Sequence, residues 1–267
     1  MKSKNFRQRV ISAAIMAPAF FATVFFGDWW FTATVAVFTL MGLREWLKIV
    51  DGTLPRPLEI LAGLSLLATL SLATGLTPAS GLAALGILTA SLLIAAMLAK
   101  RPHPAWIAIG LPYMAGGGLA IVALRACDHG LAQVSYLLAI VWGTDTGAYL
   151  AGKIIGGPKL APSISPKKTL AGSLGGITLA ILLGASVAAG FKAQNLMMAI
   201  VFAIVLSIAS QLGDLFKSWF KRRANMKDSG DLIPGHGGVL DRIDGLAFAS
   251  ILFALCEDPI RQLIGWP

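Results

Sequence analysis

Four aspartates lie in parts of the sequence that are otherwise apolar. Asp145, Asp214, Asp241 and Asp244 each fall inside or at the edge of a long apolar run. A carboxylate in such a run is costly unless it faces a cavity, a cation or a metal ion, so it is a functional candidate by default. An ion pair between helices is the simpler explanation for any one of them, but it is a poor explanation for all four. We therefore take the four aspartates as candidates for a catalytic site.

The spacing of the aspartates predicts that they lie at one depth. Asp145 and Asp214 come near the ends of two apolar runs, and Asp241 and Asp244 open a third. At a rise of 1.5 Å per residue, all four could lie within roughly 10 Å of each other along the axes of their helices. Asp241 and Asp244 are three residues apart and share a helix face, as do Asp214 and Ser218, which are four apart.

Basic, hydroxyl and glycine residues accompany the acids, as the binding of a polyphosphate requires. Glycines let a backbone approach a phosphate closely, and the start of a helix offers its amide groups to an anion. Carboxylates beside cations suggest that a divalent metal bridges protein and phosphate, and hard oxygen ligands favour Mg²⁺. Contact with anionic lipid is the simpler interpretation for Arg223 and Lys159. The candidates are Ser165, Lys167, Lys168, Thr169, Ser218, Lys221, Arg222, Lys227, His236, Gly237, Gly238 and Arg242.

Familiar nucleotide and zinc motifs are absent from the sequence. It contains neither GxxxxGK[ST] nor a strand-anchored GxGxxG, so a bound nucleotide would be held by another device. His236 has no second His or Cys nearby, and Cys127 and Cys256 form no CxxC pair. A hydrogen bond to a phosphate or to the backbone is therefore the expected role of His236.

The composition indicates a membrane protein. Of the 267 residues, 56% are hydrophobic and only 13% are charged, whereas soluble domains carry about 25% charge. The formal net charge of +9 comes from basic residues between apolar runs rather than from a patch with interleaved aromatics. This pattern favours a membrane surface over nucleic acid as the partner.

Apolar runs long enough for spanning helices predict an all-α, polytopic transmembrane bundle. The first two runs nearly touch, so they should form a helical hairpin at Gly27 and Asp28, while Gly172, Gly175 and Gly176 suit close helix packing. We predict a single integral membrane domain over 1–267, with N-terminal spans over about 10–126 and catalytic spans and loops over about 131–256. The nine predicted spans are 10–26, 29–43, 59–75, 80–99, 104–126, 131–151, 170–190, 195–216 and 238–256.

The basic residues predict the orientation of the bundle. Of the 22 Lys and Arg residues, all but Arg125, Lys192 and Arg261 fall on one side of the predicted spans. By the positive-inside rule that side is cytoplasmic. The N-terminus is then cytoplasmic, the C-terminus lies on the opposite side and the number of spans is odd. Glu45, Asp51 and Glu59 are expected in a cytoplasmic loop.

The gap-free run from Ser218 to Asp244 resembles the signature of the phosphatidate cytidylyltransferases, also called CDP-diacylglycerol synthases. Asp145 to Tyr149, Ser165 to Thr169 and Gln211 to Asp214 are similar to the same family. The resemblance covers the C-terminal half, and the N-terminal spans match only in hydrophobic character. Within the run the matching residues are Ser218, Lys221, Arg222, Lys227, Asp228, Pro234, Gly235, His236, Gly237, Gly238, Asp241, Arg242 and Asp244.

The resemblance implies a reaction of CTP with phosphatidic acid that gives CDP-diacylglycerol and pyrophosphate for phospholipid biosynthesis. It implies Mg²⁺ and suggests a monovalent cation such as K⁺, a homodimer, and a lipid bilayer as surroundings, namely the bacterial inner membrane with the active site facing the cytoplasm. A lipid phosphate is already ionised at neutral pH, so the reaction needs positioning and charge neutralisation rather than a strong base.

This reaction suggests a role for each candidate residue of the site. Asp214 and Asp241 are the main metal ligands, with Asp244 and Asp145 as further ligands or their partners. The groups that neutralise phosphates are Lys167, Lys168, Lys221 and Arg222. The groups that orient or bind the substrates are Ser165, Thr169, Ser218, Lys227, His236, Gly237, Gly238 and Arg242.

One residue departs from the family pattern, and two other functions remain as alternatives. Relatives commonly have Glu at the position of Ala171, so any role of that carboxylate is absent here or supplied elsewhere. A CTP-dependent lipid kinase would transfer the γ-phosphoryl group instead and should need a base for a neutral hydroxyl. A secondary transporter would place its charges near the middle of the bilayer in two related halves, whereas here they gather at one side.

Overall fold

The structure is a computed structural model, and it describes residues 18, 20–223 and 238–266. Over this part of the chain it is an all-α fold with one short β-hairpin, so the predicted fold class is confirmed. The described residues fall into two compact units. One lies within Met1–Ala123 and Arg223–Ile243, and the other within Leu124–Arg222 and Asp244–Pro267.

The first unit begins with a helical hairpin. Residues 20–26 are helical, and the chain then turns at Gly27, which has a positive φ of 69°. Helix α2 (Asp28–Val50) follows. The Phe20 ring lies 6.4 Å from the Phe31 ring and 6.3 Å from the Phe38 ring, measured between centroids, so the short helix folds back along α2. The predicted turn is confirmed, whereas residues 10–17 and 19 of the predicted first span lie outside the described residues.

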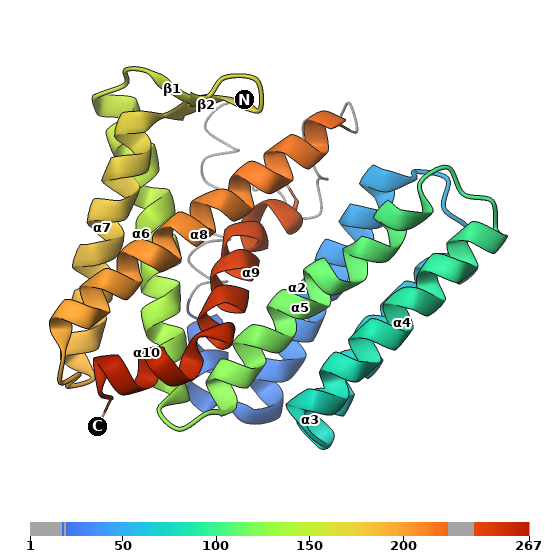
Figure 1. Cartoon of the computed structure of the whole chain (residues 1–267), viewed down its shortest axis with the longest axis horizontal. Coiled ribbons are helices and arrows are strands. Elements are labelled where there is room, and N and C mark those ends of the chain that lie inside the picture. The colour runs from blue at the N-terminus through green and yellow to red at the C-terminus, as the bar shows by residue number, and fades with distance from the viewer. Residues whose placement is uncertain (1–17, 19, 224–237, 267) are drawn as a thin grey trace. The chain divides into compact units, whose positions relative to one another are not determined.

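Three further helices complete this unit, and Figure 1 shows α3 and α4 as a neighbouring pair. They are α3 (Arg56–Gly75), α4 (Pro78–Leu98) and α5 (Pro104–Ala126). The turn between α3 and α4 is fixed by a capping box, in which the side chains of Thr77 and Ser80 each accept a hydrogen bond from the other's backbone amide. Only Leu76 and Thr77 separate the two helices, which therefore form a helical hairpin.

The second unit is built around α6 (Gly130–Ile154) and α7 (Leu170–Gly190), which lie side by side in Figure 1. The strands β1 (Lys159–Ala161) and β2 (Ser165–Thr169) connect them as an antiparallel hairpin, with Lys159 opposite Thr169. We predicted no strands here. Helices α8 (Leu196–Arg223), α9 (Leu240–Leu255) and α10 (Glu257–Ile264) follow, and the first residues of α9 belong to the first unit.

Glycines allow α6 and α7 to pack closely. A Cβ atom added to Gly147 would lie only 2.3 Å from the Gly175 carbonyl oxygen, and one added to Gly176 would lie 2.8 Å from the Thr144 carbonyl oxygen. Side chains at these positions would force the two helices apart. The predicted role of the glycines near the start of α7 is therefore confirmed.

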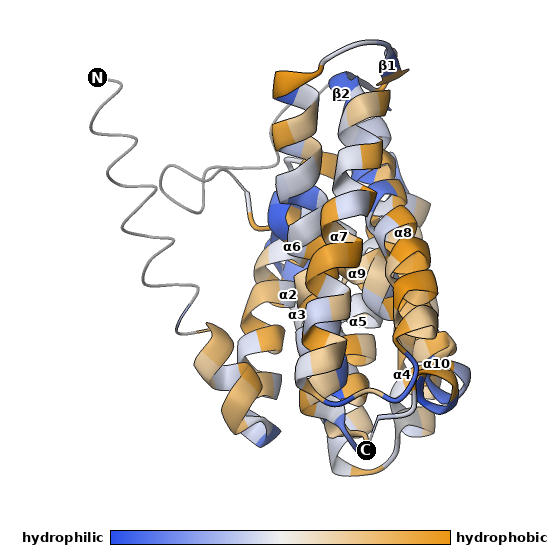
Figure 2. Ribbon diagram, turned by 90° about the vertical axis from the view of Figure 1, so that its left-hand side faces the viewer, coloured by the Kyte–Doolittle hydropathy of each residue, from blue (hydrophilic) through white to orange (hydrophobic). Residues whose placement is uncertain are grey.

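Five helices of the described chain are long and apolar enough to cross a membrane. Figure 2 shows hydrophobic residues along much of α7 and α8 and hydrophilic residues in the β-hairpin. The prediction of a polytopic membrane protein thus holds, while the number of nine spans and the orientation stay predictions. Each predicted span from the second to the ninth coincides with a helix. The five helical segments are Arg56–Gly75, Ala79–Leu98, Pro104–Ala126, Leu170–Gly190 and Leu196–Arg223.

Two helices continue beyond their apolar runs. The predicted second span ended at residue 43, but α2 continues to Val50, and the predicted eighth span ended at residue 216, but α8 continues to Arg223. No glycine or proline interrupts either extension, so nothing in the backbone ends the helix. Glu45 is therefore a helical residue, and Glu59 lies in the first turn of α3. The expected place of these two residues in a loop was wrong.

Candidate active site

Helices α8 and α9 approach each other closely at two glycines. A Cβ atom added to Gly213 would lie 2.7 Å from the backbone oxygen of Asp244, and one added to Gly245 would lie 2.6 Å from Oγ of Ser210. Any side chain at these two positions would separate the helices. The close approach brings Asp214, which follows Gly213, next to the start of α9.

Lys217 links the two aspartates across this contact. Its Nζ lies 3.2 Å from Oδ1 of Asp214 and 2.6 Å from Oδ2 of Asp244. The side chains of Lys217 and Asp244 are each only 6% exposed, and that of Asp214 is 33% exposed. Since isolated buried charges are unfavourable, the ammonium and the carboxylates stabilise one another.

The β-hairpin supplies a second ammonium. Lys168 on β2 places its Nζ 2.6 Å from Oδ2 of Asp214. Each oxygen of Asp214 thus faces a lysine. Successive side chains of a strand point to opposite faces, and the adjacent Lys167 is exposed. Lys167 and Lys168 therefore lie on opposite faces of the hairpin, and their expected role in neutralising phosphates stays a prediction.

Other contacts hold the hairpin and the helices in place. The Arg222 Nε–H on α8 donates to the Ile164 carbonyl oxygen at 3.4 Å. The buried Thr169 hydroxyl accepts a hydrogen bond from the Gly172 amide and caps α7. Ser173 on α7 donates to the side-chain oxygen of Gln211 on α8, one turn before Asp214. The hairpin, α7 and α8 are thus connected around the aspartate.

The remaining candidate residues differ in how far they are exposed to solvent. Asp145 is exposed on α6, and Asp241 is half-buried in the first turn of α9, three residues before Asp244. Gly238 is buried, Arg242 is exposed, and Ser165, Ser218 and Lys221 are half-buried. Lys227, His236 and Gly237 lie outside the described residues. Their predicted roles in binding stay predictions.

The donor groups suit a hard divalent cation. Asp214 and Asp244 direct carboxylate oxygens at one shared ammonium, and Mg²⁺ is commonly held by one or two carboxylates together with substrate phosphates. No group of three or more His, Cys, Asp or Glu side chains is arranged for a metal among the described residues.

Sequence reasoning missed two residues. Lys217 was counted only as a cytoplasmic charge, although its spacing of three residues from Asp214 on a helix was a signal that the two could pair. Glu45 is 2% exposed, and it accepts hydrogen bonds from the amides of Val239 at 3.0 Å and Leu240 at 2.8 Å. These amides were expected to be offered to a substrate anion. In the structure Glu45 occupies them.

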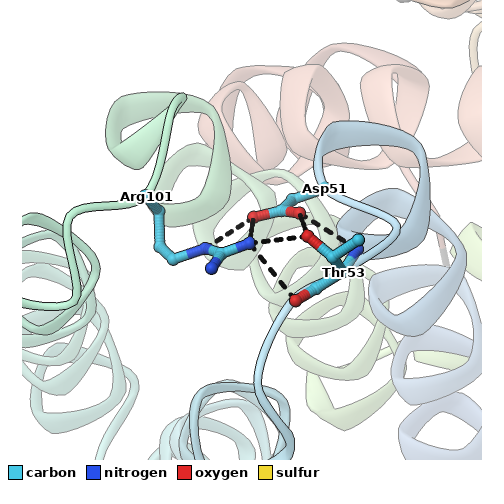
Figure 3. Close-up of polar contacts among 3 residues, drawn as sticks. All are labelled: Asp51, Thr53 and Arg101. Carbon is cyan, nitrogen blue, oxygen red and sulfur yellow. Dashed lines mark hydrogen bonds and ion pairs between the residues drawn. The ribbon is translucent and has the colours of Figure 1, made fainter.

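The first unit contains a separate ion pair, which Figure 3 shows. Arg101, just after α4, donates from Nε to Oδ2 of Asp51 at 2.7 Å, and Asp51 also accepts hydrogen bonds from the amide and hydroxyl of Thr53. Burial by itself would raise the pKa of the Asp51 carboxyl, but the hydrogen bonds from Arg101 and Thr53 outweigh it and hold that pKa below its usual value. The cluster joins two loops and stabilises this unit.

Comparisons with known proteins agree on one family. A family model described as "Cytidylyltransferase family" matches residues 7–257. A protein of Brucella suis biovar 1 named phosphatidate cytidylyltransferase is 44% identical over 172 residues, which are 64% of this chain and 64% of that protein. The matched part thus spans just under two thirds of that relative. Proteins of the same name from Bacillus subtilis (32% over 265 residues, 91% of this chain and 94% of that protein) and Helicobacter pylori (34% over 165 residues, 61% of each) are also similar.

Proposed function

Because the chain belongs to the cytidylyltransferase family, we propose that it is a CTP:phosphatidate cytidylyltransferase. The predicted resemblance to that family is confirmed by these matches. In the proposed reaction an oxygen of the phosphatidic acid phosphate attacks the α-phosphorus of CTP. The bond from that phosphorus to the β-phosphate oxygen breaks, and CDP-diacylglycerol and pyrophosphate form. Both partners are anions, so catalysis depends on holding them together and neutralising their charge.

The observation that best supports the proposal is the cluster formed by Lys168, Asp214, Lys217 and Asp244. It combines two ammonium groups with two carboxylates in one place. The ammonium groups can neutralise phosphate oxygens, and the carboxylates can bind a cation that accompanies the nucleotide. Lys221 and Arg222 follow on the same helix, one turn further toward its end. A lipid phosphate and a triphosphate both require positive charge, which the ammonium groups would supply directly and the carboxylates through a bound cation.

We assign Mg²⁺ to Asp214 and Asp244. Asp241, which the sequence hypothesis made a main ligand, and Asp145 stay candidate ligands. The metal, when bound, would neutralise charge on the α-phosphate and the leaving pyrophosphate. The protein's own part is to bind and orient. Lys168 and Lys217 hold Asp214 in place, and the exposed Lys167 is available to a substrate phosphate. K⁺ as a second cofactor is a further expectation from the family.

We place the site at the cytoplasmic side of the bacterial inner membrane. The basic residues that the charge count assigns to that side include Lys168, Lys217 and Arg222, and these gather at one end of the second unit through contacts with Asp214 and Ile164. From there CTP can arrive in water while phosphatidic acid enters from the bilayer. A homodimer is part of the same proposal and rests on the family alone.

Labelled CTP tests the proposed reaction. Purified protein in phosphatidate-containing micelles should transfer label from the α-phosphate into lipid and release pyrophosphate, and both should depend on Mg²⁺. A matched reaction uses label in the γ-phosphate, which should stay in water. Entry of γ-label into lipid would identify a lipid kinase and overturn the proposal. Failure of both labels to enter lipid would exclude both activities.

A further inference from the structure

We propose that Glu45 on α2 is a positioning residue that fixes the start of α9, and with it Asp241, for the reaction. Its Oε1 accepts the Val239 amide at 3.0 Å, and its Oε2 accepts the Leu240 amide at 2.8 Å. Both oxygens of the Glu45 carboxylate thus accept hydrogen bonds from the amides of two consecutive residues, and Glu45 is 2% exposed. Two hydrogen bonds to one carboxylate fix the orientation of the start of α9 relative to Glu45 as well as the distance between them.

A second contact on the same face of α2 supports this role. Gly42, one helical turn before Glu45, lies against Ile243 of α9. A Cβ atom added to Gly42 would lie 2.9 Å from Cδ1 of Ile243 and 2.7 Å from Sδ of Met114. Helix α2 therefore holds the first turn of α9 both by hydrogen bonds and by close packing, before and after Asp241.

Helix α2 is itself held in place next to Glu45. The neighbouring Trp46 is fully buried, and its indole N–H donates to the Trp106 carbonyl oxygen on α5 at 2.8 Å. Its ring also lies 5.0 Å from the Tyr113 ring, measured between centroids. These contacts join α2 to α5 directly beside Glu45. They support the orientation in which the Glu45 carboxylate faces the start of α9.

The hydrogen bonds of Glu45 determine what the start of α9 can bind. The four amides at the start of a helix lack partners within the helix, and a carboxylate there also interacts favourably with the helix dipole. With two amides taken by Glu45, the start of α9 acts as an attachment point rather than as a phosphate site. Asp241 directly follows Leu240, so its position depends on this attachment. A displacement of about 1 Å in a catalytic group can lower the rate about 100-fold.

Hydrogen exchange tests the attachment without reference to any reaction. Glu45→Gln keeps the size of the side chain but replaces one accepting oxygen with an NH₂ group. In the full-length protein we expect amide exchange in residues 238–243 to become about tenfold faster or more, with exchange in α7 unchanged. Asp51→Asn is the matched control, because it alters another buried carboxylate of the same unit that does not contact α9. Unchanged exchange at residues 238–243 in Glu45→Gln would overturn the proposal.

Kinetics test whether the attachment serves the reaction, and this part rests on the proposed function. We expect Glu45→Gln to lower kcat for transfer of α-label by about 10- to 100-fold with little change in the KM for CTP. Gly42→Ala should act in the same direction through Ile243, while Asp51→Asn should lower thermal stability but leave kcat of the folded protein unchanged. Equal kcat losses in Glu45→Gln and Asp51→Asn would reduce Glu45 to a general structural role and overturn the proposal. If the wild-type protein transfers no label, the proposed reaction fails, and the exchange experiment still decides whether Glu45 holds α9.

Discussion

The ammonium of Lys217 lies 2.6 Å from the carboxylate of Asp244, and both side chains are 6% exposed. A lysine three residues along α8 from Asp214 thus reaches a second aspartate on α9. Asp214 also pairs with Lys168. Each of the two carboxylates therefore faces at least one ammonium group, and these pairings determine how substitutions should act.

Replacing Lys217 with Met should destabilise the protein strongly, because it leaves two carboxylates close together with one ammonium. Removing one member of a buried ion pair typically costs about 3–5 kcal/mol. Thermal unfolding of the detergent-solubilised protein measures the loss. We expect Mg²⁺ to raise the unfolding temperature of Lys217→Met more than that of the wild type, since the cation can take the place of the lost charge.

The matched control for Lys217→Met is the double variant with Asp244→Asn. Removing both charges should restore much of the lost stability, because no carboxylate is then left without its cation. If the double variant is no more stable than Lys217→Met, the interaction between Lys217 and Asp244 does not carry the effect.

The two lysines of β2 should behave differently although they are adjacent. Lys168→Met removes the partner of an Asp214 oxygen and should lower stability by about 1 kcal/mol, since the pair is only partly buried. Lys167→Met should leave thermal unfolding unchanged and raise the KM for a substrate, because the exposed side chain is available to phosphate. Parallel unfolding and steady-state measurements on both variants check this. The same unfolding shift in both variants would contradict the strand geometry.

Asp241→Asn keeps the size of the side chain and removes its charge. If Asp241 contributes to metal binding, Mg²⁺-dependent turnover should fall by about 100-fold or more while the protein remains correctly inserted. Asp258→Asn is a suitable control, because Asp258 lies on α10, exposed and paired with Arg261. Near-normal Mg²⁺-dependent turnover in Asp241→Asn would remove this residue from the metal site.

The ion pair of Asp51 and Arg101 predicts a dependence of stability on pH. The pKa of Asp51 is lower in the folded than in the unfolded chain, so the pair stabilises the fold above about pH 4, where the unfolded carboxyl is also ionised. Its contribution is lost as the pH falls through the folded pKa. Asp51→Asn should therefore be less stable than the wild type at pH 7 by about 1–3 kcal/mol. The difference should shrink in acid, as unfolding at pH 7 and pH 3 would measure, and a constant difference would contradict the assignment.

The apolar runs predicted which segments are helical, because apolar side chains and helical backbone are both required in lipid. They did not predict where α2 and α8 end. There the helix leaves the apolar run and carries charged residues such as Glu45 and Lys217, which the hydropathy pattern treats as loop. The hairpin at β1 and β2 was also missed, since the run from Ser165 to Thr169 is polar and has no alternating pattern.

The sequence predicted which types of residue form the candidate site better than it predicted which residues contact one another. The cost of burying charge selected four aspartates, and the structure brings two of them, Asp214 and Asp244, together at Lys217. Spacing along one helix could suggest Lys217 as a neighbour of Asp214. The hydrogen bonds of Glu45 to Val239 and Leu240 join residues that are far apart in the chain, and no local pattern encodes such a contact.

The close packing of α6 and α7 has a consequence for the synthesis of the protein. These helices are consecutive and separated only by the β-hairpin, so they can associate while the ribosome is still translating the remainder of the chain. Lys168 is then already in place before Asp214 emerges on α8, and Asp244 is translated later still. The charged cluster is thus completed only when α8 and α9 have been made. A nascent chain arrested before α9 would carry Lys168, Asp214 and Lys217 without Asp244.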